Sequence, residues 1–154
     1  GMSCEGYRSM KKPPSLAIAM TPFPYSVDHN ASLEFAQQLM AQHKVRHLPV
    51  TEEQGLVGLL TERDMRSVEH LHSGLSAKRE LTVNDAYMAD PYIVDLHEPL
   101  DNVLMTMAER HIGSAIVTRA GKLVGMFTAV DACRCFGTFL REHFPRVEGD
   151  DDVA

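Results

Sequence analysis

The amino-acid sequence predicts an α+β fold in which two βαββα repeats pack sheet to sheet about a pseudo-two-fold axis. The chain has 154 residues, 44% of them apolar and 23% charged, which is ordinary globular composition. A shift of 67 residues aligns Pro24–Asp64 with Pro91–Asp131 without a gap, and 14 of the 41 aligned residues are identical. A repeat of about 60 residues buries too little surface to be secure alone, so we expect the two copies to share a core.

Each copy predicts the same order of elements: strand, helix, strand, strand, helix. A short strand follows a proline, and Leu33, Ala36 and Met40 recur at helical spacing in the first copy. Two further strands are joined by a turn that contains glycine, and the second helix begins at a threonine. These elements are expected at residues 25–28, 31–43, 47–51, 56–60 and from 61 onwards, and again at 92–95, 98–110, 114–119, 123–127 and from 128 onwards.

The domain organisation follows from the duplication. Turn-forming residues between His70 and Thr82 indicate the connection between the copies, and Gly1 before Met2 resembles the scar of a cleaved purification tag. The repeats and tails use up the 154 residues, so we expect the output to pass through a separate effector protein. The predicted division is residues 1–14 as an N-terminal extension, 15–73 as the first repeat, 74–84 as the linker, 85–144 as the second repeat and 145–154 as an acidic C-terminal tail.

Charge and hydropathy argue against nucleic-acid and membrane partners. The net charge is −6, and residues 148–154 carry −4 of it, so the nearly balanced remainder lacks the positive field that nucleic-acid binding needs. The longest apolar stretch, Leu16–Met20, is far shorter than the roughly 20 residues of a membrane-spanning helix. No apolar segment of a secretory signal follows Lys11 and Lys12. We therefore expect a cytoplasmic protein without a membrane partner.

Signatures of metal binding and catalysis are not found in the sequence. Cys4, Cys133 and Cys135 are too few for a disulfide framework, and the last two point in different directions on a helix. The sequence contains no phosphate-binding loop, no nucleophile elbow and no zinc-binding helix motif. We expect no metal, no required cofactor and no enzymatic activity.

The motif Gly-h-h-Thr-x-x-Asp (h apolar) ends the aligned part of both copies, at Gly58–Asp64 and Gly125–Asp131. One interpretation is structural, because Thr-x-x-Asp at a strand-to-helix junction is nearly a capping box. The other is functional. A helix N-terminus favours phosphate, and a carboxylate beside it can accept hydrogen bonds from both hydroxyls of a ribose.

With two such motifs at one constant offset, the chain resembles a pair of cystathionine-β-synthase (CBS) domains, the Bateman module, over about residues 16–143. The resemblance implies a regulatory module that binds adenosine-containing nucleotides, of the AMP, ADP or ATP class, in two clefts between the repeats. It also implies frequent dimerisation, so we expect a homodimer. The alternatives are a structural or dimerisation module without ligand, and a binder of S-adenosylmethionine or NAD(H).

The resemblance assigns expected roles to particular residues. Asp64 and Asp131 would hold ribose hydroxyls, and Thr61 and Thr128 would lie near ribose or phosphate. Arg63 would bind phosphate, unless it is an ordinary surface arginine, and its equivalent Val130 puts equal occupancy of the two clefts in doubt. Backbone groups facing adenine are expected at His47, Leu48 and Pro49, and at Ser114, Ala115 and Ile116.

The expected walls around the base come from the start of each copy. In the first copy they are Phe23, Pro24 and Tyr25, and in the second Asp90, Pro91 and Tyr92. For the two tyrosines, plain core packing is an equal alternative.

An apolar stripe on the last helix also has two interpretations. Its residues are Phe136, Phe139, Leu140 and Phe144. We favour packing against the protein's own sheet, and the alternative is the face of a homodimer.

Overall fold

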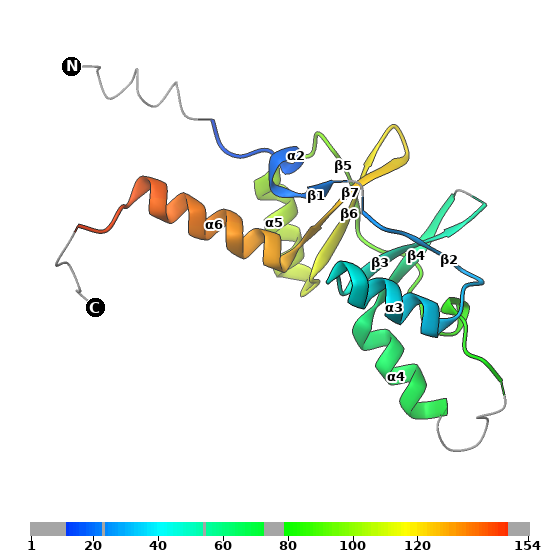
Figure 1. The fold of residues 1–154 in the computed structure, drawn as a ribbon. Coiled ribbons are helices and arrows are strands. Elements are labelled where there is room, and N and C mark those ends of the chain that lie inside the picture. The colour runs from blue at the N-terminus through cyan, green and yellow to red at the C-terminus, as the bar shows by residue number, and fades with distance from the viewer. Residues whose placement is uncertain (1–11, 23, 54, 73–78, 148–154) are drawn as a thin grey trace.

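The computed structural model describes residues 12–22, 24–53, 55–72 and 79–147 (Figure 1). The predicted N-terminal extension and acidic tail lie mostly outside the described residues, and so do Phe23 and Gln54. Two halves of mixed helix and strand lie side by side in Figure 1. Their element order confirms the predicted α+β fold of two βαββα repeats.

Both repeats contain the five predicted elements in the predicted order. The connection between the repeats was expected to begin at His70, but the second helix of the first repeat continues through His72. The first repeat comprises β2 (Val27–Asp28), α3 (Leu33–His43), β3 (His47–Glu52), β4 (Gly55–Thr61) and α4 (Glu62–His72). The second comprises β5 (Ile93–Asp95), α5 (Leu100–Arg110), β6 (Ser114–Arg119), β7 (Lys122–Thr128) and α6 (Ala129–His143).

The strands form two sheets, with the orders β2-β3-β4 and β1-β7-β6-β5, where β1 is Thr21–Pro22. In each repeat the first strand is parallel to the second, and the second and third form an antiparallel hairpin. Strand β2 is shorter than predicted. The Ile116 N–H donates to the Tyr92 carbonyl at 2.9 Å, whereas Pro49, the equivalent of Ile116, has no N–H to donate.

Two short segments cross from one repeat to the other. The N-terminal crossing segment (residues 15–22) contains helix α2 (Leu16–Ala19), and its Leu16 is buried in the core of the second repeat. The central crossing segment (residues 82–88) contains the 3₁₀ helix η1 (Val83–Asp85), and its Val83 is buried in the core of the first repeat. Leu16 and Val83 stand 67 residues apart, so each repeat supplies part of the other's core at equivalent positions.

The crossing segments also extend the sheets. Strand β1 pairs antiparallel with β7, and Leu59 of β4 exchanges two backbone hydrogen bonds with Met88, of 2.9 and 2.8 Å. These close approaches explain the glycine of the shared motif. A Cβ on Gly58 would lie 2.4 Å from the Met88 carbonyl oxygen, and one on Gly125 would lie 2.9 Å from that of Thr21.

The sheets pack face to face through a third apolar cluster, as predicted. Leu59 of β4 contacts Ile116 of β6 and Met126 of β7, and all three are buried. Leu59 and Met126 are equivalent residues of the two repeats, which places them on opposite sides of the pseudo-two-fold axis.

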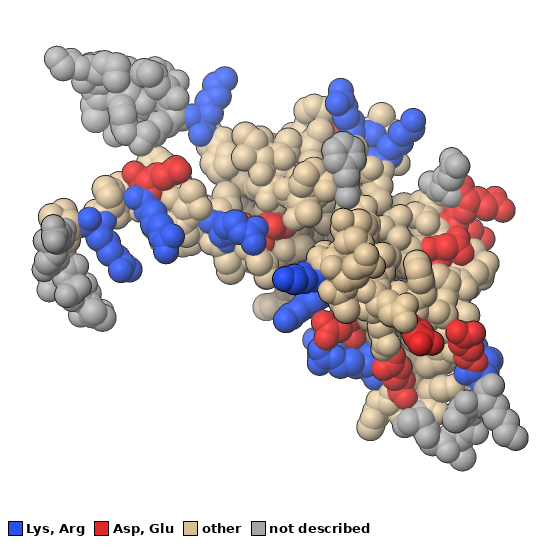
Figure 2. All heavy atoms as spheres, viewed as in Figure 1, with Lys and Arg blue, Asp and Glu red and all other residues tan. Residues whose placement is uncertain are grey.

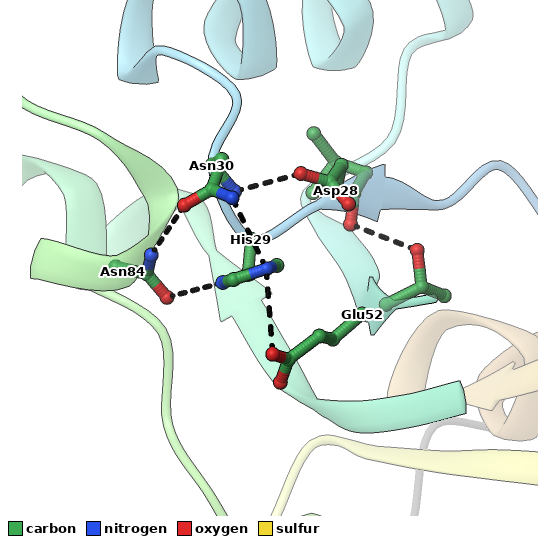
Figure 3. Close-up of polar contacts among 7 residues, drawn as sticks. Asp28, His29, Asn30, Glu52 and Asn84 are labelled. Atoms are coloured by element: carbon green, nitrogen blue, oxygen red, sulfur yellow. Dashed lines mark hydrogen bonds and ion pairs between the residues drawn. The ribbon is translucent and has the colours of Figure 1, made fainter. Parts of the chain in front are cut away.

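A polar network fixes the central crossing segment to the first repeat (Figure 3). The side chains of His29 and Asn84 meet at 3.0 Å, and the Asn84 amide donates to the Asn30 side-chain oxygen at 3.1 Å. The Asn84 backbone N–H donates to the His29 carbonyl at 3.0 Å, and Glu52 lies 3.8 Å from the His29 ring. Both backbone and side chain of Asn84 are therefore held by the β2–α3 turn.

The favoured interpretation of the apolar stripe on α6 is wrong. Phe136, Phe139, Leu140 and Phe144 are between 40% and 70% exposed. Helix α6 packs on the second core only near its start, through Ala132 and Cys135, and then runs beyond the sheet (Figure 1). The stripe therefore lies past the surface that it was expected to cover.

Replacement of Gly58 by alanine tests the close approach of the central crossing segment. The added methyl group would collide with the Met88 backbone, so we expect Gly58→Ala to lower the free energy of unfolding by about 1–3 kcal/mol. Gly137→Ala is the control, since a Cβ there meets no atom within 4 Å among the described residues, and should stabilise α6 by about 0.5–1 kcal/mol. Urea unfolding measures both, and equal stability of the Gly58 variant and the parent would contradict the packing described.

Candidate functional site

Part of the set of predicted ligand-binding residues lies at the N-termini of α4 and α6. His47 at the start of β3 pairs with Thr61 at the end of β4, directly before α4. Ser114 and Thr128 pair in the same way before α6. We call His47, Thr61, Arg63 and Asp64 the Asp64 site, and their equivalents Ser114, Thr128, Val130 and Asp131 the Asp131 site.

Both aspartates cap their helices. The Thr61 N–H donates to the Asp64 carboxylate at 3.3 Å, and the Asp64 N–H donates to the Thr61 hydroxyl oxygen at 3.0 Å. At the second site the corresponding distances are 2.9 and 3.3 Å. The capping-box geometry is therefore present twice, and any ligand would use carboxylate oxygens that already hold a helix end.

The two carboxylates differ in how many donors they already satisfy. Asp131 is only 6% exposed and accepts three further hydrogen bonds, from the Thr128 hydroxyl at 3.2 Å, the Arg134 guanidinium at 3.2 Å and the Thr21 hydroxyl at 3.5 Å. Asp64 is partly exposed, and its Oδ1 has no hydrogen-bond partner among the described residues. Thr21 reaches Asp131 from the N-terminal crossing segment, so this site contains residues of both repeats.

Basic and acidic side chains both lie near the Asp64 site. Burial lowers the pKa of His47 below its usual 6.5, the charge of Arg46 lowers it further, and the charge of Asp64 partly opposes both. Glu62 forms ion pairs with Arg46 and Arg66, and the hydrogen bond from Arg66 lowers its pKa. Figure 2 shows acidic and basic side chains intermingled over the first repeat, without a continuous basic surface on the visible face.

Arg63 is exposed on the first turn of α4 and makes no ion pair with any residue that the structure describes. Its own backbone carbonyl accepts a hydrogen bond from the Ser67 hydroxyl at 3.1 Å. A guanidinium so placed is available for an external anion. Its predicted role in phosphate binding stays a prediction.

The residues expected to face adenine are mostly buried in strands. Leu48, Pro49, Ala115 and Ile116 are fully buried, so only their backbone could meet a ligand. Pro24 and Pro91 are partly buried at the strand entries, and Phe23 lies outside the described residues.

The two predicted tyrosines stack on the first helix of their own repeat. The Tyr25 ring lies 3.5 Å from that of His43, and the Arg110 guanidinium lies 5.3 Å from the Tyr92 ring. His43 and Arg110 are equivalent residues. Tyr92 also packs against the second core, whereas Tyr25 is half exposed, so core packing describes only the second tyrosine.

A groove of about 970 Å³ borders the Asp131 site between α2 and α6. Thr21 and Arg134 line it together with Asp131, and sequence reasoning missed both. Arg134 follows Asp131 by one helical turn, a signal that the sequence contains, whereas Thr21 requires knowledge of the crossing. A smaller hollow of about 480 Å³, between α3 and α4, includes no predicted site residue.

The described residues contain no group of three histidine, cysteine or acidic side chains placed to hold a metal ion. Cys133 and Cys135 are free thiols on α6. None of the helices in the described ranges is long and apolar enough to cross a membrane.

Comparison with known proteins matches the chain twice to the family model "CBS domain", at residues 16–70 and 83–137. The L-aspartate semialdehyde sulfurtransferase of Methanocaldococcus jannaschii is 28% identical over 134 residues, which are 84% of this chain and 25% of that protein. The inosine-5′-monophosphate dehydrogenase of Thermoplasma acidophilum is 30% identical over 128 residues, 83% of this chain and 24% of that enzyme. The chain thus spans about a quarter of the length of both.

Solved structures share the fold over nearly their whole length. The CBS domain pair of protein MJ0100, in complex with 5′-methylthioadenosine and S-adenosyl-L-methionine, has a TM-score of 0.73 and 23% identity, over 83% of this chain and 99% of that one. CBSX2 in complex with AMP has a TM-score of 0.70 and 25% identity, over 82% of this chain and 98% of that one.

The lowered pKa of His47 makes a prediction about stability and pH. The unfolded chain binds a proton at His47 more readily than the folded chain, so His47 costs no stability well above pH 6.5 and destabilises the fold as the pH falls below it. His47→Ser, which copies Ser114, should reduce the loss of unfolding free energy between pH 7 and pH 5. Urea unfolding at both pH values measures this, and an unchanged loss would show that His47 does not titrate differently on folding.

Proposed function

This chain belongs to the CBS domain family, and we propose that it is a regulatory module that binds an adenosine-containing nucleotide between its repeats and relays binding to a partner protein. The observation that carries the proposal is the pair of equivalent sites at the N-termini of α4 and α6. Each combines a carboxylate, a helix N-terminus and a crossing segment from the other repeat. MJ0100 and CBSX2, which share the fold, hold adenosine compounds.

The ribose is the part of the ligand that these aspartates suit best. An ionised carboxylate accepts hydrogen bonds only, and its two oxygens match the two vicinal hydroxyls of a ribose. Oδ1 of Asp64 accepts no hydrogen bond from any described residue, so it could accept one from a ribose hydroxyl without displacing another donor. The N–H groups at the start of each helix and its positive dipole end favour a phosphate nearby.

Adenine would lie against the strand backbones of residues 47–49 or 114–116. The walls proposed for the base are Phe23, Pro24 and Tyr25 at one site, and Pro91 and Tyr92 at the other. The stacking of the half-exposed Tyr25 ring on the His43 imidazole supports the first of these walls, because it holds that ring at the surface.

Homodimerisation is a second part of the proposal, favoured by the exposed stripe on α6. Four large apolar side chains on one helix face form a patch of the kind that a second copy covers. A module that dimerises without ligand is the competing function, and the same stripe supports it.

Ligand binding is tested by titration calorimetry with AMP, ADP, ATP, adenosine, NADH and S-adenosylmethionine. Asp64→Glu and Asp131→Glu keep a carboxylate and place the commoner residue of a capping box. Stability should hardly change at the partly exposed Asp64, whereas the buried Asp131 has less room for the added methylene, so urea unfolding accompanies both titrations. The longer side chain displaces the oxygens by about 1 Å, and loss of one hydrogen bond to a charged group, worth about 1.5–3 kcal/mol, should weaken binding at that site at least tenfold. Unchanged affinity in both variants would reduce the aspartates to helix caps.

Dimerisation is tested by light scattering. We expect twice the chain mass of 17.1 kDa at micromolar concentration. Phe136→Arg places a charge in the stripe and should give monomers. Met105→Arg is the matched control, since Met105 on α5 is similarly exposed but lies outside the stripe. A monomeric parent protein, or equal dissociation by both variants, overturns the assignment of this face.

A further inference from the structure

We infer that the two sites accept different classes of adenosine ligand: the Asp64 site a nucleotide with a 5′-phosphate, and the Asp131 site an adenosine whose 5′ substituent carries no phosphate. The inference rests on the proposed function and names the ligand class of each site. It starts from the charge difference between residues that the duplication made equivalent.

The Asp64 site offers cations to a phosphate. Arg63 directly precedes Asp64 on the first turn of α4, so a ribose held by Asp64 brings its 5′ substituent within reach of an exposed guanidinium that has no ion pair among the described residues. Arg46 lies at the adjoining start of β3, next to His47. Arg46 shares Glu62 with Arg66, so the cations of this site outnumber its acidic partners.

Both Arg46 and Arg63, and His47 beside them, are replaced at the Asp131 site by residues without charge. The equivalents of Arg46, His47 and Arg63 are Gly113, Ser114 and Val130. Arg134 is the cation nearest Asp131, and its guanidinium donates to the Asp131 carboxylate at 3.2 Å. The charge of Arg134 is thus already balanced by Asp131, and a phosphate would meet no arginine at the position before the aspartate; the further cation is Lys12, which lines the neighbouring groove.

The surroundings of Asp131 suit an apolar substituent instead. The groove of about 970 Å³ between α2 and α6 opens beside it and is lined by apolar and sulfur-containing side chains. Its charged lining is mixed, with Asp131 and Glu142 facing Lys12, Arg134 and His143. The apolar part comprises Ile18, Ala19, Met20, Cys135 and Phe139. A thioether such as that of 5′-methylthioadenosine would bury its methyl group against these residues without leaving a charge unpaired.

The test is a pair of calorimetric titrations with AMP and 5′-methylthioadenosine on the full chain. Each compound should bind once per chain, and saturation with one should leave the affinity for the other unchanged. Asp64→Glu should weaken AMP alone, and Asp131→Glu should weaken 5′-methylthioadenosine alone.

Two variants that give one repeat the residue of the other at the position before the aspartate serve as a matched pair. Arg63→Val copies the second repeat and should weaken AMP about tenfold while leaving 5′-methylthioadenosine unchanged. Val130→Arg copies the first repeat, at a position 65% exposed where folding is not at risk, and should create a second AMP site per chain. Thermal unfolding of both variants verifies that the fold is intact.

The outcomes separate the inference from the proposed function. Competition of AMP and 5′-methylthioadenosine for one site, or two AMP molecules bound to the parent chain, overturns the division of ligands and leaves nucleotide binding intact. Absence of binding by every adenosine compound overturns the proposed function itself. The inference is supported if each compound binds independently to one site per chain, and if Arg63→Val and Val130→Arg change the affinity and the number of AMP sites as described.

Discussion

The exchange of crossing segments between the two repeats is the constraint on which the rest of the structure depends. Leu16 completes the core of the second repeat and Val83 that of the first, so neither repeat has a full core without its partner. The exchange also fixes the sequence of the shared motif, since only glycine at positions 58 and 125 lets the other repeat's backbone approach. Residues 15–22 and 82–88 belong to one repeat by sequence and pack on the other. The same two segments therefore complete the cores and lie beside the shared motifs.

The capping aspartates show why a structural and a functional interpretation of one motif need not compete. A capping box uses one carboxylate oxygen to hold the helix start, and the other oxygen remains for a ligand if nothing else reaches it. At Asp64 that condition is met among the described contacts. At Asp131 the crossing residue Thr21 and the neighbouring Arg134 both reach the second oxygen, so a ribose hydroxyl there would have to replace the long Thr21 contact of 3.5 Å. The two caps are equivalent, and the different residues around them make the two sites unequal.

The duplication could be predicted from the sequence, because identity at one constant offset is independent of any structural detail. Strand and helix positions followed within a few residues, and β2 fell short because Pro49 removes a donor that Ile116 keeps. The packing of each crossing segment on the other repeat could not be predicted from periodicity. Periodicity shows that a segment has apolar residues, but it does not show in which hydrophobic core they are buried. Helical spacing likewise identified the stripe from Phe136 to Phe144, and wrongly assigned it to the protein's own sheet, because the spacing does not tell where the sheet ends.

The arrangement explains how a bound ligand could act at a distance. A ligand held at Asp64 or Asp131 would contact a helix of one repeat beside the crossing segment of the other, so its binding energy would oppose separation of the repeats. These aspartates lie on the first turns of α4 and α6, and α6 carries the exposed stripe at its far end. A small rotation of α6 about its capped N-terminus is largest at residues 136–144, because displacement grows with distance from the pivot. The face proposed to meet a second copy would therefore be the part of the helix that moves most in response to a ligand at Asp131.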